Sequence, residues 1–342
     1  MSQEAVNRAV EEAHSVLWRR FIHANGLIHD YEGEIPTPED CALGRPNAIG
    51  WWSPIENGPM FTGLYLPAAC ERARRSADPT DIAQVRELVR GLMLCASVSD
   101  VPGFIVRGTG TDGTCHYPLG SDDQTHPWFY GLHAYVTSGI PTEEERAQVV
   151  AKMVDVADVL ETNGWRCPCD GAFRGEFRGA FTGHWFRDAV RYLHLLKVMH
   201  DVTGDAMWLD RYLNALVETP DRCDFTRLEL SAQGYVPDRT EIANIDTQGL
   251  WIYVGCQGSL ARLIDLDSDE SRRARYRAGL AINAENAFVA IEAYKVFDNS
   301  DAQVFGHANW REGYPTWFPQ TTQEDAKLLA CKGDKAKLGT RK

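Results

Sequence analysis

Hydrophobic residues recur with a helical period along this chain, and the pattern is clearest between residues 142 and 160. Thr142 and Glu145 have the spacing of a capping box, in which each side chain bonds the backbone N–H of the other residue. The apolar residues that follow are spaced i, i+3, i+4, i+7 and i+10, and they are Val150, Met153, Val154, Ala157 and Leu160. The pattern predicts an amphipathic helix with one face in water.

Helices of this kind repeat at a fixed period. Short polar breaks at Asp78, Pro141, Gly204 and Asp267 lie 63 residues apart. The segment before each break is apolar or aromatic around most of its circumference, whereas the segment after it is amphipathic. A buried helix, a turn and a half-exposed helix form the unit of an α/α hairpin array. We therefore predict four hairpins from about residue 56 to 298.

The predicted fold class is all-α, an α/α toroid of repeated helical hairpins. A helix before the four hairpins and a Trp-rich segment after them would bring the ring to five or six hairpins, while an open solenoid is the alternative. Parallel α/β folds are disfavoured because runs of β-branched residues between the helices are missing. No linker divides the chain, so we expect a single domain over residues 1–342, with disorder expected over about 325–342.

Charge and composition exclude several classes of partner. The chain has 35 Lys and Arg against 48 Asp and Glu, a formal net charge of −13, and no basic stripe, which argues against nucleic acid. No apolar run approaches the length of a membrane span, and the acidic N-terminus does not read as a signal peptide. Nine scattered cysteines favour reduced thiols in the cytoplasm. Cys167-Pro168-Cys169 is too short a motif to indicate zinc, so we expect no metal and no other cofactor.

The repeat also resembles a known group of enzymes. The hairpin period, the turn sequence VTGDAMWLDRY from residue 202 and the acidic, aromatic loops before the buried helices resemble the six-hairpin, or (α/α)6-toroid, glycosidase superfamily. That group includes unsaturated glucuronyl hydrolases and β-glucuronidase-like members. The resemblance covers residues 10 to 320 as architecture, although the chain stops sooner than six complete hairpins require. It implies carbohydrate chemistry, but toroids also serve lyases, epimerases and terpene cyclases.

Candidate catalytic carboxylates lie in the loops that enter the buried helices. In a hairpin array these loops gather at one end, so residues about sixty positions apart converge there. The candidates are Glu56, Asp122, Asp123 and Asp246. Glycoside hydrolysis needs two carboxyl groups, one to protonate the leaving oxygen and one to activate water or attack carbon. Glu56 and Asp123 are the preferred pair, and a first-turn carboxylate that stabilises its helix is the alternative for each residue.

Aromatic and cationic residues at the same loops are candidate substrate contacts. They are Trp52, His126, Trp128, Tyr130, His184, Arg187, Trp251 and Trp310. Tryptophan faces stack on sugars, and packing between helices is their other common role. Arg187 lies in a cationic segment with Arg178, and guanidinium groups bind the carboxylate of a uronic acid, or else form surface ion pairs. A Gly-rich loop over residues 107–120 would bring Arg107 to the same mouth.

Three functions remain open from the sequence. The first is a glycoside hydrolase with paired carboxylates, acting on oligosaccharides that contain uronic acid. The second is a polysaccharide lyase or related uronate enzyme, in which His126 or Tyr130 removes a proton and Arg187 neutralises a carboxylate. The third is a non-catalytic helical-repeat protein that binds a ligand on its concave face. The oligomeric state is not indicated.

Overall fold

The structure is a computed structural model, and it describes residues 2–235, 247–296 and 317–340. These residues are mostly helical, which confirms the predicted all-α class. The helices are α1 (Gln3–Val16), α2 (Pro38–Ala42), α3 (Gly58–Ser76), α4 (Pro79–Cys95), α5 (Asp122–Val136), α6 (Glu143–Thr162), α7 (Phe186–Thr203), α8 (Ala206–Val217), α9 (Arg227–Gln233), α10 (Thr247–Leu266), α11 (Glu270–Val296) and α12 (Gln323–Thr340). Two short strands, β1 (Arg166–Pro168) and β2 (Phe177–Ala180), pair as a two-stranded sheet.

The chain forms two compact units. The first unit comprises Met1–Val159, Cys167–Arg178 and Phe305–Lys342, and the second comprises Leu160–Arg166 and Gly179–Val304. Each unit has its own helix packing and its own candidate site, so the two are described separately below.

The four predicted breaks each separate two helices, namely α3 from α4, α5 from α6, α7 from α8 and α10 from α11. Ala77 ends α3 in the left-handed conformation, and the Asp78 side chain then accepts from the Thr80 N–H to start α4. Gly204 ends α7 in the same way. The Thr142–Glu145 capping box is confirmed, because each side chain accepts from the backbone N–H of the other residue. The helical-hairpin period is therefore present in the described chain.

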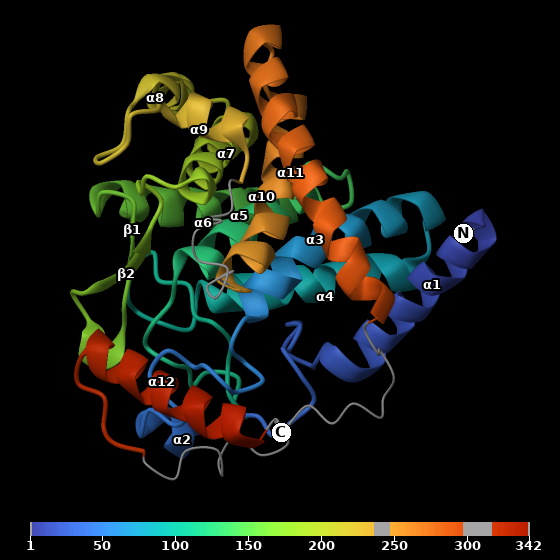
Figure 1. Ribbon diagram of the computed structural model, residues 1–342. Helices are drawn as coiled ribbons and strands as arrows, with labels where there is room; N and C mark the ends of the chain where they lie inside the picture. The colour runs from blue at the N-terminus through green and yellow to red at the C-terminus, as the bar shows by residue number, and fades with distance from the viewer. Residues whose placement is uncertain (1, 236–246, 297–316, 341–342) are drawn as a thin grey trace. The chain divides into compact units, whose positions relative to one another are not determined.

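In the first unit, α3 packs against α4 and α5 (Figure 1). Glycine sets the distance between α3 and α5: a Cβ on Gly63 would lie 2.0 Å from the carbonyl oxygen of Pro127. Only a residue without a side chain allows the two backbones to approach so closely. This crossing fixes the starts of α3 and α5, which carry the candidate site.

The buried face of α6 differs slightly from its predicted position. Met153, Ala157 and Leu160 are buried as expected, but Val149 and Val156 complete the buried stripe. Val150 and Val154 are only half-buried. Val150 and Val154 fit the helical period as well as the neighbouring valines do, but tertiary packing buries Val149 and Val156 instead.

In the second unit, α7 packs against α8, α9 and α10, while α11 packs against α9 and α10 (Figure 1). Leu193, Leu195 and Leu196 of α7 are all fully buried, so this helix is enclosed around most of its circumference, as its sequence predicts. By contrast, α8 buries Trp208 and Tyr212 and leaves its opposite face in water.

The ends of the chain add two further helices. The N-terminal segment forms α1, the expected amphipathic helix, which has no fully buried residue. The C-terminal segment expected to be disordered instead contains α12, in which Ala326, Leu329 and Ala330 are buried. Burial of this small apolar stripe explains the ordering of the helix. Within the described residues, no helix is long and apolar enough to cross a membrane.

Candidate active site

The start of α3 in the first unit gathers polar side chains around Asn57, the residue that precedes the helix. The Asn57 backbone N–H and side-chain amide donate to the two carboxylate oxygens of Asp30, at 2.8 and 2.7 Å. Its own Oδ1 accepts from Gln124 Nε2 at 2.8 Å and from Arg107 Nη2 at 3.1 Å. Asn57 thus links the loop before α3 with α5 and with the Gly-rich loop.

Arg107 is the cation of this cluster, and only 2% of its surface is exposed. Its Nε donates to the Glu56 carbonyl oxygen at 2.7 Å, and its Nη1 donates to the Ser121 hydroxyl at 3.0 Å. The Arg107 carbonyl in turn accepts the N–H of Gly58 at 2.9 Å. The arginine therefore fixes the residues that start both helices, because Ser121 is the N-cap of α5.

The carboxyl groups of Asp30 and Glu56 interact with each other at this position. Burial, and then the negative charge of Glu56, raise the pKa of Asp30 well above its ordinary value. The hydrogen bonds from Asn57 and the charge of Arg107 oppose that shift without cancelling it. Two neighbouring carboxyl groups of this kind retain a proton at a pH where an isolated aspartate is ionised.

Asp122 and Asp123 occupy the first turn of α5 and are half-buried. Ser121 is the N-cap, so both residues occupy the first-turn position considered from the sequence. A helix N-terminus favours negative charge, and both carboxylates attract the nearby guanidinium of Arg178. Both carboxyl groups therefore lie where a helix N-terminus and a guanidinium favour negative charge.

Arg178, the second residue of β2, is the second cation of this site. Its Nη1 donates to the Gly120 carbonyl oxygen at 2.6 Å, and its guanidinium lies 5.9 Å from the ring centre of Trp51. Burial and the charge of Arg107 lower the pKa of Arg178 to about 10, against the attraction of Asp123 and Asp122. It therefore stays charged at neutral pH.

The loop before α3 is held in a strained conformation at Trp52, whose φ is 72°. The Trp52 backbone N–H donates to Glu56 Oε2 at 3.0 Å, and its carbonyl accepts the Tyr31 hydroxyl at 2.5 Å. A tryptophan in the left-handed region is uncommon, and such strain concentrates at functional sites. The conformation fixes the Glu56 side chain against its own loop, with Trp52 half-exposed beside it.

The other aromatic candidates of the first unit lie farther along α5. His126 and Trp128 have no exposed surface, and the Trp128 indole donates to the Leu92 carbonyl at 2.8 Å. Trp128 also meets Phe129 edge to face, with ring centres 4.9 Å apart. These contacts give Trp128 the packing role that the sequence left open. Tyr130 is half-buried.

Two candidates of the second unit lie at the start of α7. His184 lies against Trp185, with ring centres 4.6 Å apart, just before α7. Arg187 lies 3.4 Å from Asp188, whose pKa is raised by burial, and Asp188 accepts the Trp185 backbone N–H. Both candidates therefore take part in local contacts at the start of α7.

Three further candidates lie wholly or partly outside the described residues. Asp246 and Trp310 lie outside the described residues, and Trp251 lies in α10 at a position where only the backbone is described. Their proposed roles stay predictions.

Asp30 is the functional candidate that the sequence did not reveal. It lies before the first hairpin, outside the 63-residue period, and no neighbouring motif marks it. The acidic and aromatic sequence HDYEGE around it is the one local signal that resembles the loops singled out elsewhere.

The cysteines show no sign of a metal centre in the described part of the chain, where no group of three or more His, Cys, Asp or Glu residues could hold an ion. Cys167 and Cys169 are buried free thiols. Burial raises the pKa of both, to about 12 for Cys169, so they are protonated structural residues at neutral pH.

Comparison of the chain with protein families, curated proteins and solved structures gives no significant match.

Proposed function

We propose that the protein is a glycoside hydrolase whose reacting groups are the carboxyls of the first unit. The observation that supports this most strongly is the unequal environment of two carboxyl pairs. Asp30 has a raised pKa beside Glu56, whereas Asp122 and Asp123 have the cationic Arg178 nearby. Glycosidases separate acid and base roles by such differences in environment.

In this proposal the Asp30–Glu56 pair supplies the general acid. A proton that the pair holds at a pH where an isolated aspartate is ionised is available to the leaving glycosidic oxygen, and such transfer contributes about 10²–10⁴-fold to rate. Glu56 is half-exposed and its carboxylate is held by the Trp52 backbone N–H, so we assign contact with substrate to Glu56. Asp30 then acts on the proton affinity of Glu56 and not on the sugar.

Asp123 is the proposed base or nucleophile, with Asp122 as its rival in the same helical turn. Their place at the N-terminus of α5 and their attraction to Arg178 favour the ionised form that either role needs. The pairing of Glu56 with Asp123 is the one preferred from the sequence.

A uronic acid is the proposed substrate unit. Arg178 retains its charge and its guanidinium lies over the ring of Trp51, an arrangement that supports binding of a sugar carboxylate beside an aromatic face. We also propose that the helical hairpins close into the α/α toroid expected from their period. The free, largely buried thiols are compatible with the cytoplasm as the site of action.

A substrate panel tests the reaction class. The protein is incubated with aryl glycosides, aryl glucuronides and uronate polysaccharides, while aryl release and the ultraviolet absorbance of unsaturated uronates are followed together. The proposal predicts aryl release from a uronide without unsaturated product. An unsaturated product would establish a lyase, and no turnover on any member would contradict an enzyme of this substrate class.

A further inference from the structure

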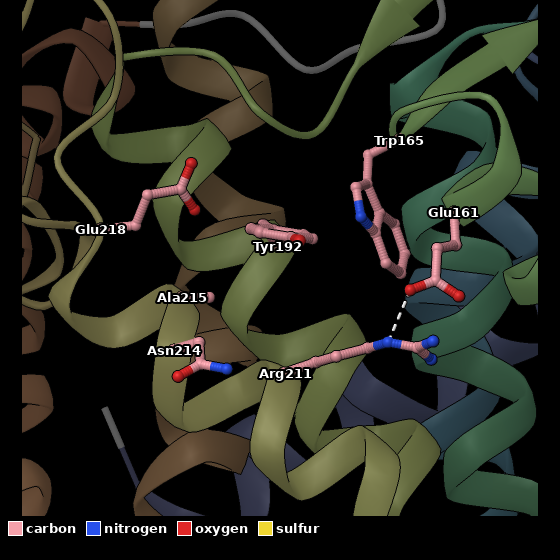
Figure 2. Close-up of a pocket in the computed structure, with 7 residues that line it drawn as sticks. All are labelled: Glu161, Trp165, Tyr192, Arg211, Asn214, Ala215 and Glu218. Carbon is pink, nitrogen blue, oxygen red and sulfur yellow. Dashed lines mark ion pairs between the residues drawn. The ribbon is translucent and has the colours of Figure 1, made fainter.

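A cavity lies entirely within the second unit and has no part in the site above. Its volume is about 280 Å³. Helix α8 supplies Arg211, Asn214 and Ala215, and Tyr192 comes from α7 (Figure 2). We call it the Trp165–Tyr192 pocket after its two aromatic side chains. It is slightly smaller than ordinary ligand pockets of about 300–1,000 Å³, so it suits one small molecule.

The aromatic wall is held in a defined arrangement. Trp165 and Tyr192 meet edge to face, with ring centres 4.9 Å apart at 64°. Trp165 has a φ of 63°, a strained value for a tryptophan, and its backbone is fixed by bonds with Leu160 and Phe181. Glycine would adopt this φ without strain, whereas a tryptophan adopts it only when its surroundings hold it. The Trp165 ring is held against Tyr192 and Trp208.

Two carboxylates line the pocket, and each is paired with an arginine. Glu161 accepts from Arg211 Nε at 2.5 Å, and Figure 2 shows this pair beside the Trp165 ring. On the other side, Glu218 accepts two bonds of 3.2 Å from the guanidinium of Arg227, whose side chain is fully buried. Both carboxylates are thus held in place with their charges balanced.

Several polar groups around the aromatic wall are able to form hydrogen bonds with a ligand. The Nη1 of Arg211 is buried and has no hydrogen-bond partner among the described groups. The amide of Asn214 is on the exposed face of α8, and half of the Glu218 side chain is exposed. Burial, with the charge of Glu218 second, raises the pKa of Tyr192 to about 12, so its hydroxyl is neutral and can donate or accept.

The balance of charge decides what kind of ligand fits. Two carboxylates and two guanidiniums sum to zero, which favours neither an anion nor a cation. An aromatic wall with carboxylates nearby also suits quaternary ammonium groups, but the positive charges of Arg211 and Arg227 oppose a cation there. Carboxylates that accept from hydroxyls, an amide that donates and an aromatic face for C–H groups are the contacts that a neutral sugar requires.

We propose that the Trp165–Tyr192 pocket is a binding site for one neutral sugar unit. Binding here does not depend on the hydrolase activity proposed for the first unit.

Nuclear magnetic resonance on the full chain tests this directly. Methyl pyranosides of glucose, galactose, mannose and xylose are titrated in turn, and the indole N–H resonances are followed, with Trp165→Phe identifying the Trp165 signal. The proposal predicts that at least one pyranoside shifts the Trp165 resonance in a saturable way. Absence of any such shift overturns it, as does a response only to glucuronic acid or only to choline.

Two variants separate binding from folding. Asn214→Ala should weaken the same titration about 2–10-fold, the effect of one lost hydrogen bond, while alanine suits the helical position. Asp210→Ala, on the exposed face of the same helix outside the pocket, is the matched control and should bind as wild type. Equal affinity in both variants contradicts the proposal.

A third variant separates this site from the first one. Asp123→Asn should leave the pyranoside titration unchanged whether or not it affects hydrolysis. Loss of the Trp165 response in Asp123→Asn would show that the pocket is not an independent site.

Discussion

Both units contain a pair of carboxyl groups, but the groups that surround each pair differ. In the first unit Asp30 lies beside Glu56, and burial leaves the two carboxyls competing for a proton. In the second, Glu161 and Glu218 each have an arginine partner. Carboxyls with unequal proton affinities can transfer a proton, whereas neutralised carboxylates offer fixed hydrogen-bond acceptors. From this comparison we infer that the charged groups next to a carboxylate, and not its presence alone, determine the role it can take.

The largest effect on stability is expected when Arg107 is replaced. Replacing it with methionine should cost about 3–5 kcal/mol of stability, because the Glu56 carbonyl, the Ser121 hydroxyl and Asn57 Oδ1 all lose their buried charged donor. Urea denaturation measures the change. Arg174→Met is the matched control, because its exposed ion pair with Asp100 is screened by water and should contribute little to stability. Equal effects of the two variants would contradict the central position given to Arg107.

Glycine substitutions at the helix crossings separate the units. Gly63→Ala places a methyl 2.0 Å from the Pro127 carbonyl, and Gly279→Ala places one 1.9 Å from the Ser231 carbonyl. Each should destabilise the protein by about 1–3 kcal/mol through overpacking.

The two variants should impair different functions, hydrolysis in one and pyranoside binding in the other. Gly63→Ala displaces the α3–α5 crossing and should reduce hydrolysis, while pyranoside binding persists. Gly279→Ala displaces α9, which carries Arg227, and should weaken pyranoside binding while hydrolysis persists. Activity and the Trp165 titration, measured on both proteins below their melting temperatures, test the division. Loss of both functions in both variants would mean that the two sites are not independent.

A smaller, graded effect is expected from pH. The folded-state pKa of Asp30 is raised above its ordinary value of 3.8, so the folded protein holds a proton that the unfolded chain releases. This contribution to stability is complete below about pH 4 and is lost as pH rises through the raised pKa. Asp30→Asn removes that dependence, so the stability of wild type relative to the variant should fall with rising pH. Parallel stability curves for the two proteins would contradict the raised pKa.

Local features of the fold were predictable from the sequence. The Thr142–Glu145 box and the breaks at Asp78 and Gly204 depend on neighbouring residues, and they appear where their patterns place them. The buried stripe of α6 was displaced because Val149 and Val150 fit the helical period equally well, and only packing distinguishes them.

The sites were less predictable because distant segments form them. Glu56 and Asp123 could be proposed from their place before the buried helices, but Asp30 meets Asn57, the residue after Glu56, through contacts that no local pattern encodes. Glu161, Tyr192 and Glu218 come from three different segments, so the pocket became visible only in the fold.

The central claim is that Glu56 and Asp123 carry out glycoside hydrolysis. The most direct test is the turnover of Glu56→Gln and Asp123→Asn on a substrate that the wild-type protein cleaves, with melting temperature measured alongside. The account predicts a loss of about 10²–10⁴-fold in kcat for each variant at an unchanged melting temperature, because the amides keep the shape of the side chains but cannot exchange the proton. Wild-type turnover in both variants would contradict it.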